Sequence, residues 1–304
     1  MNSRLKRVAE RALVRSGVAR MAQARLATSS LLILAYHDIV PTGARNDGAS
    51  SLHLPQREFA RQLDLISITH DVVSLDSAVT HQSTERSRVA ITFDDAYVGA
   101  LTAGVEELQR RQLPATVFVA PALLGRDTWW DIMAMHSAGI VRGDLNSHAM
   151  WQLAGRRDQV LAWAAGATTN ASLPTPSARI GTLAELESAV AYPRLAVAAH
   201  TWSHVNLCAV AADELAREVS LPLDWLSARF RSFVPMISYP YGLSSREVHA
   251  AASRAGYSRA FRVDGGWMND PVNADPFAMP RYNVPAGLSL DGLRLRLAGI
   301  GASS

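Results

Sequence analysis

Two short apolar runs that lie far apart in the sequence each end in side chains that can bind a metal ion. Residues 89–91 lead into Thr-Phe-Asp-Asp at 92–95, and residues 195–199 lead into His-Thr-Trp-Ser-His at 200–204. Short apolar runs predict buried strands of a parallel sheet. Because the carboxyl ends of parallel strands carry the chemistry in α/β folds, we expect two carboxylates and two imidazoles at one edge. Such oxygen and nitrogen ligands suit Zn²⁺ and similar divalent ions.

The rest of the chain alternates strand and helix patterns. We expect strands at 31–36, 72–74, 89–93, 115–120, 195–199, 236–239 and 258–261, and helices at 56–68, 98–111, 213–229 and 244–255. Ser244 followed by Glu247 indicates the capped start of the last helix. This order predicts a parallel sheet, open or closed into a barrel, in an α/β fold. Residues 121–190 contain no clear strand and are expected to form a helical insertion on the face that carries the metal-binding side chains.

The composition limits the classes of partner. The chain has 304 residues, 48% of them hydrophobic, and a net charge of only +3. Most of the positive excess lies in residues 1–29, and the remainder is close to neutral. No basic face with interleaved aromatic residues is found, so no nucleic-acid partner is expected. The single cysteine, Cys208, excludes an intrachain disulfide and fits a reducing compartment.

Residues 1–29 form a basic segment that we treat as an arm separate from the domain at 30–304. Arginines interrupt every apolar stretch before Leu31, so neither a signal peptide nor a transmembrane helix is expected. The spacing of its apolar residues favours an amphipathic helix that packs on the body or rests on an anionic membrane surface. A loosely ordered solvated arm is the alternative. The expected location is cytoplasmic, or peripheral to the inner face of the membrane.

Several motifs, taken together and in order, resemble the polysaccharide deacetylases (NodB-homology domain, carbohydrate esterase family 4). Residues 92–95 and 200–204 resemble the first two motifs of that family, and Tyr-Pro-Tyr-Gly at 239–242 resembles the third. Residues 275–281 resemble a late segment of exopolysaccharide-cluster members. Tyr-His-Asp at 36–38 resembles the early motif of the branch that deacetylates poly-N-acetylglucosamine. The likeness spans about residues 31–285 and implies a distorted (β/α)7-type barrel of parallel strands that forms the catalytic domain.

The chemistry of amide hydrolysis fits these positions. One divalent ion, Zn²⁺ or else Co²⁺, Ni²⁺ or Fe²⁺, held by Asp95, His200 and His204 would leave a coordination position open. Asp94 cannot easily bind the same ion as its neighbour and is better placed as the general base. The backbone N–H of Tyr241 is expected to stabilise the oxyanion. The family resemblance implies the same roles.

Three departures from the family pattern affect the assignment of the general base and the general acid. Ser238 stands where the third motif usually has an arginine, and Arg281 is expected to supply that charge to Asp94; the alternative is that Arg281 only forms a structural ion pair with Asp275. Ala96 replaces the glycine that usually follows the two aspartates, which limits backbone freedom there. No histidine follows Met279, so the late general acid of many relatives is missing and His37 is expected to take its place. A fourth metal ligand or a structural histidine is the alternative for His37.

Four aromatic residues are expected to contact a sugar: Trp129, Trp130, Trp202 and Tyr239. Core packing is the alternative for Trp129 and Trp130. The favoured function is removal of N-acetyl groups from the amino sugars of a polysaccharide or oligosaccharide. One alternative is a catalytically silent relative that only binds carbohydrate. Another is a hydrolase of a different non-peptide C–N bond in an acetylated small molecule.

Overall fold

Strands and helices alternate along most of the chain. The computed structural model describes residues 3–45, 48–80, 85–135, 141, 143–165 and 178–301, and the Thr/Ser/Pro-rich stretch 168–177 lies outside this part. In chain order the elements are α1 (Ser3–Arg15), α2 (Val18–Gln23), β1 (Leu31–Tyr36), β2 (Asp38–Val40), β3 (His53–Pro55), α3 (Gln56–Thr69), β4 (Asp71–Val72), α4 (Leu75–Thr80), β5 (Arg88–Phe93), the π-helical η1 (Ala100–Gly104), α5 (Val105–Arg111), β6 (Ala115–Val119), the 3-10 turn η2 (Pro121–Leu123), α6 (Trp129–Met135), α7 (Gly143–Trp151), α8 (Arg157–Ala165), α9 (Leu183–Ala189), β7 (Leu195–Ala199), η4 (Leu207–Ala209), α10 (Ala212–Arg229), β8 (Phe233–Ser238), η5 (Pro240–Gly242), α11 (Arg246–Ala255), β9 (Arg259–Phe261), β10 (Tyr282–Asn283) and α12 (Leu290–Leu297).

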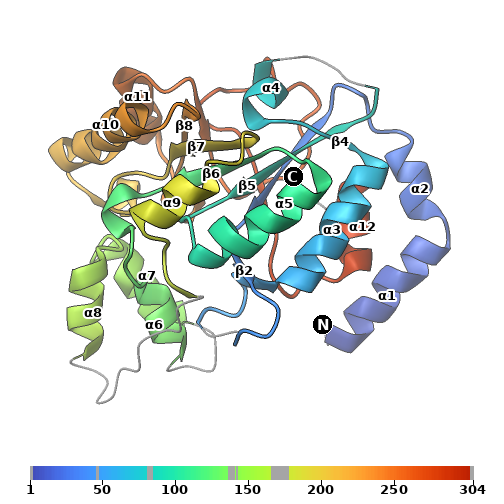
Figure 1. Ribbon diagram of the computed structural model, residues 1–304, viewed down its shortest axis with the longest axis horizontal. Coiled ribbons are helices and arrows are strands. Elements are labelled where there is room, and N and C mark those ends of the chain that lie inside the picture. Colours follow the sequence, from blue (N-terminus) through green and yellow to red (C-terminus); the bar gives the residue numbers. More distant parts are fainter. Residues whose placement is uncertain are drawn as a thin grey trace.

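One parallel sheet organises the fold. Within the described residues it has eight strands in the order β10-β1-β5-β6-β7-β8-β9, with β4 beside β5, and every pairing is parallel. Strands β2 and β3 form a separate parallel pair. The sheet curls into a half-barrel with helices around it (Figure 1), which confirms the distorted barrel of parallel strands expected from the motifs.

The central strands are largely apolar because both faces of the sheet are buried. Alternate residues of β1 enter different clusters. Leu32 and Leu34 pack with helix residues such as Phe59, whereas Leu31 and Ile33 pack with residues of β6, β8 and β9 inside the curl. This two-sided burial explains why the runs read as continuously hydrophobic in the sequence, and it fixes where each strand ends.

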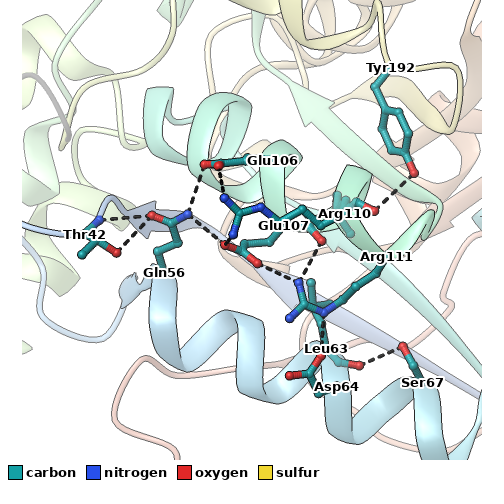
Figure 2. A network of polar contacts seen from close by, with 11 residues as sticks. Thr42, Gln56, Leu63, Asp64, Ser67, Glu106, Glu107, Arg110, Arg111 and Tyr192 are labelled. Carbon is teal, nitrogen blue, oxygen red and sulfur yellow. Dashed lines mark hydrogen bonds and ion pairs between the residues drawn. The ribbon is translucent and has the colours of Figure 1, made fainter.

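A polar network joins α3 to α5 on the outer side of the sheet, as Figure 2 shows. The Glu107 carboxylate is nearly fully buried and accepts hydrogen bonds from Gln56 Nε2 at 2.9 Å and from Arg111 Nη1 at 2.7 Å. Arg111 Nε also donates to Asp64 at 2.7 Å. These charge-assisted bonds fix the two helices relative to each other and therefore the strands on which they pack.

Two local features differ from the sequence prediction. The helix expected over 98–111 opens with the π-helical segment η1 before α5 begins. The cap of α11 is Ser245, whose side chain accepts a hydrogen bond from the Val248 N–H, and Ser244 instead bonds His249. Gly256 ends that helix at φ 102°, in the left-handed conformation that favours glycine.

The expected insertion at 121–190 is helical where the structure describes it. Helices α6, α7 and α8 lie together at one end of the sheet (Figure 1). The arm also contains two helices, and Ala19 of α2 packs against Leu295 and Ala298 at the end of α12. In the described part of the chain, no helix is both long and apolar enough to cross a membrane. The boundaries of the arm and of the insertion stay predictions.

Candidate active site

The end of β5 presents two buried aspartates to one edge of the sheet. Asp94 and Asp95 are each 3% exposed. Asp95 and Ala96 have positive φ angles of 69° and 60°, which turn the chain sharply so that the two carboxylates point differently. The left-handed region disfavours residues with a Cβ, so the alanine that replaces the usual glycine is strained here.

The end of β7 brings two imidazoles to the same place. His200 follows the strand directly, and its Nδ1–H donates to the Ser238 carbonyl at 2.8 Å, which leaves Nε2 free as a ligand atom. The His204 ring is held between Trp130 and Tyr241, with ring centroids 4.7 and 4.9 Å away. Burial lowers the pKa of His200 to about 4, so its neutral form is favoured.

The donor set of Asp95, His200 and His204 fits a divalent ion. One ligand atom from each residue lies within 4.8 Å of the others, and all three residues are buried. His200 Nε2 and His204 Nε2 are 3.5 and 3.1 Å from Asp95 Oδ1. Among the described residues, that oxygen is buried and has no partner with hydrogen-bond geometry. A buried carboxylate oxygen without a partner is unfavourable unless a cation satisfies it, so the residues suit a metal.

Asp94 is paired with Arg281 beneath the site. The Arg281 guanidinium, which is fully buried, donates to Asp94 Oδ1 at 2.8 Å and to Oδ2 at 2.7 Å. It also bonds Ser238 Oγ and Thr92 Oγ1. Burial alone would raise the pKa of Asp94, but the charge of Arg281 and that of His200 hold the pKa well below its ordinary value. The carboxylate therefore stays ionised.

The third motif forms the tight turn η5 after β8. Tyr241 has φ 60° and Gly242 has φ 71°. A Cβ at Gly242 would come within 2.5 Å of Val263 Cγ2 and 3.0 Å of the Val263 backbone nitrogen, so only glycine fits. The Tyr241 hydroxyl donates to the His204 carbonyl at 3.3 Å, which ties this turn to the second histidine.

A cavity of about 390 Å³ opens over these residues. Its volume lies within the range of small-molecule sites. The residues predicted from the sequence that line it are His37, Asp94, Asp95, Trp129, Trp130, His200, His204, Tyr239 and Tyr241. His37 follows β1 and is only partly buried. It lines the same cavity as Asp94 and Asp95.

The aromatic residues expected to contact a sugar separate into two groups. Trp129, Trp130 and Tyr239 line the cavity, although the two indole N–H groups are used internally: Trp129 donates to Tyr241 Oη and Trp130 donates to Tyr97 Oη. Trp202 does not line it. The Trp202 ring packs against Trp225 of α10, with centroids 6.5 Å apart, because the left-handed Thr201 turns the chain before it. The expected sugar contact of Trp202 has no support in this geometry.

Sequence reasoning missed some residues of the site. Asn146 and Met150 of α7 and Asn283 of β10 also line the cavity. Asn283 ends a two-residue strand beside β1, which is too short to give a periodic pattern. No pattern marked α7. His53 also gave no signal, yet it is fully buried between two carboxylates, with Nδ1 2.9 Å from Asp38 Oδ2 and Nε2 2.8 Å from Asp131 Oδ1.

Comparison with known proteins agrees with this geometry. The family model for polysaccharide deacetylases matches residues 81–260, which is more than half of the chain. No sequence among the curated proteins matches the chain. The matched span contains both aspartates, both histidines and the Tyr-Pro-Tyr-Gly turn, whereas His37 and Arg281 lie outside it.

Solved structures share the fold at low sequence identity. IcaB from Ammonifex degensii has 18% identity and a TM-score of 0.62, over 90% of this chain and 99% of that one. The Streptococcus pyogenes deacetylase PplD in complex with acetate has 16% identity and a TM-score of 0.61, over 89% and 99%. A de-N-acetylase from Aggregatibacter actinomycetemcomitans has 13% identity and a TM-score of 0.58, over 87% and 98%. With the family model covering both central motifs and the fold shared, the chain belongs to the polysaccharide deacetylase family.

Proposed function

We propose that this chain removes N-acetyl groups from the amino sugars of a polysaccharide or oligosaccharide by metal-dependent hydrolysis. The observation that carries the proposal is the pairing of two different carboxylates in one cavity. Asp95 faces His200 and His204 with an oxygen that has no hydrogen-bond partner in the described part of the chain, and Asp94 is held ionised by Arg281. The first arrangement suits a metal ligand and the second suits a base, and amide hydrolysis requires both.

Asp95, His200 and His204 would hold the ion. A divalent ion bound there supplies a Lewis acid, which polarises a carbonyl and makes water more acidic. The Nδ1–H of His200 is committed to the Ser238 carbonyl, an arrangement that commonly orients metal-binding imidazoles. The Nδ1 atom of His204 has no partner among the described residues. Packing between Trp130 and Tyr241 orients the His204 ring instead.

Asp94 accepts the proton of the attacking water in this proposal. The bidentate contact with Arg281 fixes the plane of the carboxylate and keeps it deprotonated. Because the same contact lowers the pKa of Asp94, it also weakens the carboxylate as a base. Arg281 therefore acts by positioning Asp94 and by matching its charge, and it lies too deep to reach the substrate.

His37 donates a proton to the departing amine, and the Tyr241 N–H stabilises the oxyanion. An amide nitrogen leaves readily only when it is protonated, so an acid must line the same cavity as the base. Apart from His200 and His204, His37 is the histidine of the described chain that lines this cavity. The left-handed turn at Tyr241 places that residue at the cavity wall, where a backbone donor is useful.

An N-acetylated amino sugar is the proposed substrate. The cavity has aromatic walls formed by Trp130, Tyr239 and Tyr241, with polar groups beneath. Aromatic rings suit the apolar faces of sugar rings, and the few polar groups fix their orientation. The A. actinomycetemcomitans structure, a de-N-acetylase with the same fold, supports action on N-acetyl groups.

Acetate release from N-acetylglucosamine oligomers tests the proposal. We expect equal amounts of acetate and free amine, loss of both after chelation, and recovery on addition of Zn²⁺, Co²⁺ or Ni²⁺. Replacement of His200 and His204 by alanine should abolish stoichiometric metal retention, measured by elemental analysis. Oligomer binding without any acetate release by the metal-loaded protein would favour a silent carbohydrate-binding relative. Full metal content in the double variant would refute the ligand assignment.

A further inference from the structure

Exposed hydrophobic side chains are concentrated in the arm. Among the described residues, five of the eight large hydrophobic residues that are exposed lie on α1 or α2: Leu5 (63% exposed), Val8 (67%), Leu13 (41%), Val18 (37%) and Met21 (58%). Isolated exposed apolar residues are common on protein surfaces and need no explanation, but a group of them on one element indicates an interaction surface.

Most of the apolar residues of helix α1 face away from the body, although Val14 packs against Leu295 and Ala298. Among the residues of α1 whose burial the structure describes, only Glu10 is buried, and its carboxylate accepts a hydrogen bond from Ser289 Oγ at 2.6 Å. Leu5, Val8 and Ala12 are exposed on the opposite side. A helix that only packed on the body would bury its apolar stripe, whereas α1 leaves most of its apolar residues exposed.

Cations surround the outward apolar residues. Lys6, Arg7, Arg11, Arg15 and Arg20 are all exposed, and the only acidic residue of the arm, Glu10, is turned inward. An open groove on α1 is lined by Arg7, Arg11 and Arg15 together with Val8 and Ala12. The contacts of the cations with acids are long: Lys6 Nζ lies 3.9 Å from Glu10 Oε1, and Arg11 Nε lies 3.9 Å from Asp291 Oδ2.

We propose that α1 and α2 form a docking surface for an anionic lipid bilayer. Apolar side chains flanked by arginines on a strongly amphipathic helix match an interfacial helix, whose apolar face enters the acyl boundary while its cations meet lipid phosphates. Nucleic acid would need the cations but would leave Leu5 and Val8 exposed. The uniform positive charge also disfavours a second copy of this surface, since the two copies would repel each other.

Vesicle sedimentation with the full-length protein tests the docking surface. We expect binding to vesicles of phosphatidylcholine mixed with phosphatidylglycerol and little binding to phosphatidylcholine alone. Each charge removed should lower the partition coefficient roughly fivefold, so Arg7→Gln with Arg11→Gln should lower it roughly 25-fold. Leu5→Ser with Val8→Ser should lower it about tenfold or more through the lost apolar contact.

A matched pair on another helix provides the control. Arg217→Gln with Leu221→Ser changes one exposed cation and one exposed hydrophobic residue of α10 and should leave binding unchanged. Acetate release from soluble oligomers should stay at the parental rate in every variant, because none of these residues lines the cavity. Equal binding to both kinds of vesicle would overturn the proposal. So would an arm-dependent dimer in light scattering, or arm-dependent binding to duplex DNA, without vesicle binding.

Discussion

Backbone strain is concentrated where the proposed chemistry takes place. Seven described residues other than glycine have positive φ angles, and five of them belong to the three central motifs or follow them directly: Asp95, Ala96, Thr201, His204 and Tyr241. Each such conformation costs about 1–2 kcal/mol relative to the ordinary regions. The surrounding buried contacts must offset this strain. It orients the Asp95 and His204 ligand atoms toward each other at the ends of β5 and β7.

The side chain of Arg281 offers a direct test of the charge pairing. Replacing Arg281 with glutamine should lower kcat at least about tenfold, because Asp94 loses its bidentate partner. It should also lower the free energy of unfolding by about 3–5 kcal/mol, since a buried carboxylate is left unpaired. Steady-state kinetics and urea unfolding measure the two effects.

Ser238→Ala is the matched control for Arg281, because it removes one hydrogen bond to the same guanidinium and leaves the ion pair in place. It should cost about 1 kcal/mol and leave most of the activity. Equal kinetic losses in both variants would contradict the idea that the charge of Arg281 is what matters.

The sequence predicted the positions of some residues of the candidate site better than those of others. Asp95, His200 and His204 were predictable because each follows a strand whose end the pattern fixes. Arg281 was predictable only from the serine at 238, which left the Asp94 carboxylate without its usual partner. Trp202 lies between two of the proposed ligands in sequence, but its ring packs against Trp225 because the left-handed Thr201 rotates the chain there, so its sugar contact stays a prediction.

One buried histidine connects two elements on either side of the cavity. His53 of β3 lies between Asp38 of β2 and Asp131 of α6. Asp131 also accepts hydrogen bonds from Tyr97 and Thr128. The Tyr97 hydroxyl in turn accepts the indole N–H of Trp130, a cavity residue. This chain of contacts holds the first helix of the insertion against the strand edge.

Replacing His53 with glutamine should loosen that connection. Burial alone would lower the pKa of His53, but the hydrogen bonds to Asp131 and Asp38 raise the pKa to about 10, so the ring is a cation. Two buried carboxylates would lose this cation, so we expect a loss of about 3–5 kcal/mol in the free energy of unfolding. KM for oligomers should rise more than kcat falls, since Trp130 shifts while the metal ligands stay. His148→Gln, a change to a partly exposed histidine of α7, should cost less than about 1 kcal/mol. An unchanged KM in a folded His53 variant would argue against the connection.

Short elements were harder to predict from the sequence than long ones. The strands β1, β5, β6 and β7, which have five or six residues each, were predictable from their largely apolar sequences. Strands β2, β3 and β10 have only two or three residues each and gave no pattern, although the equally short β4 and β9 overlap the strands expected at 72–74 and 258–261. The π-helical turn η1 was also hidden, because its residues fit an ordinary helical pattern.

The arm and α12 cover one side of the whole molecule, and a buried histidine lies beneath them. His70 Nε2 donates to the Leu297 carbonyl at 3.2 Å, and its ring lies against Trp267 with centroids 5.4 Å apart. Burial lowers the pKa of His70 to about 4, although the bond to Leu297 opposes the shift. The folded state therefore favours the neutral ring.

This histidine should make the folded state sensitive to mild acid. The unfolded chain takes up a proton near pH 6.5 and the folded chain does so only near pH 4. Stability is therefore fully present above about pH 6.5 and falls between these values, by roughly 3 kcal/mol at most. Urea unfolding followed by tryptophan fluorescence across this range should show a shallower pH dependence in His70→Asn. The same slope in both proteins would contradict this assignment.

The proposed function of the whole molecule requires different roles for two adjacent carboxylates, with Asp95 as a metal ligand and Asp94 as the general base. The most direct test is to measure bound metal and acetate release together in Asp94→Asn. We predict stoichiometric metal, because Asp95, His200 and His204 are untouched, and a rate reduced by about 10²–10⁴ for want of the base. Near-parental acetate release, or loss of the metal along with activity, would contradict the separate roles of Asp94 and Asp95.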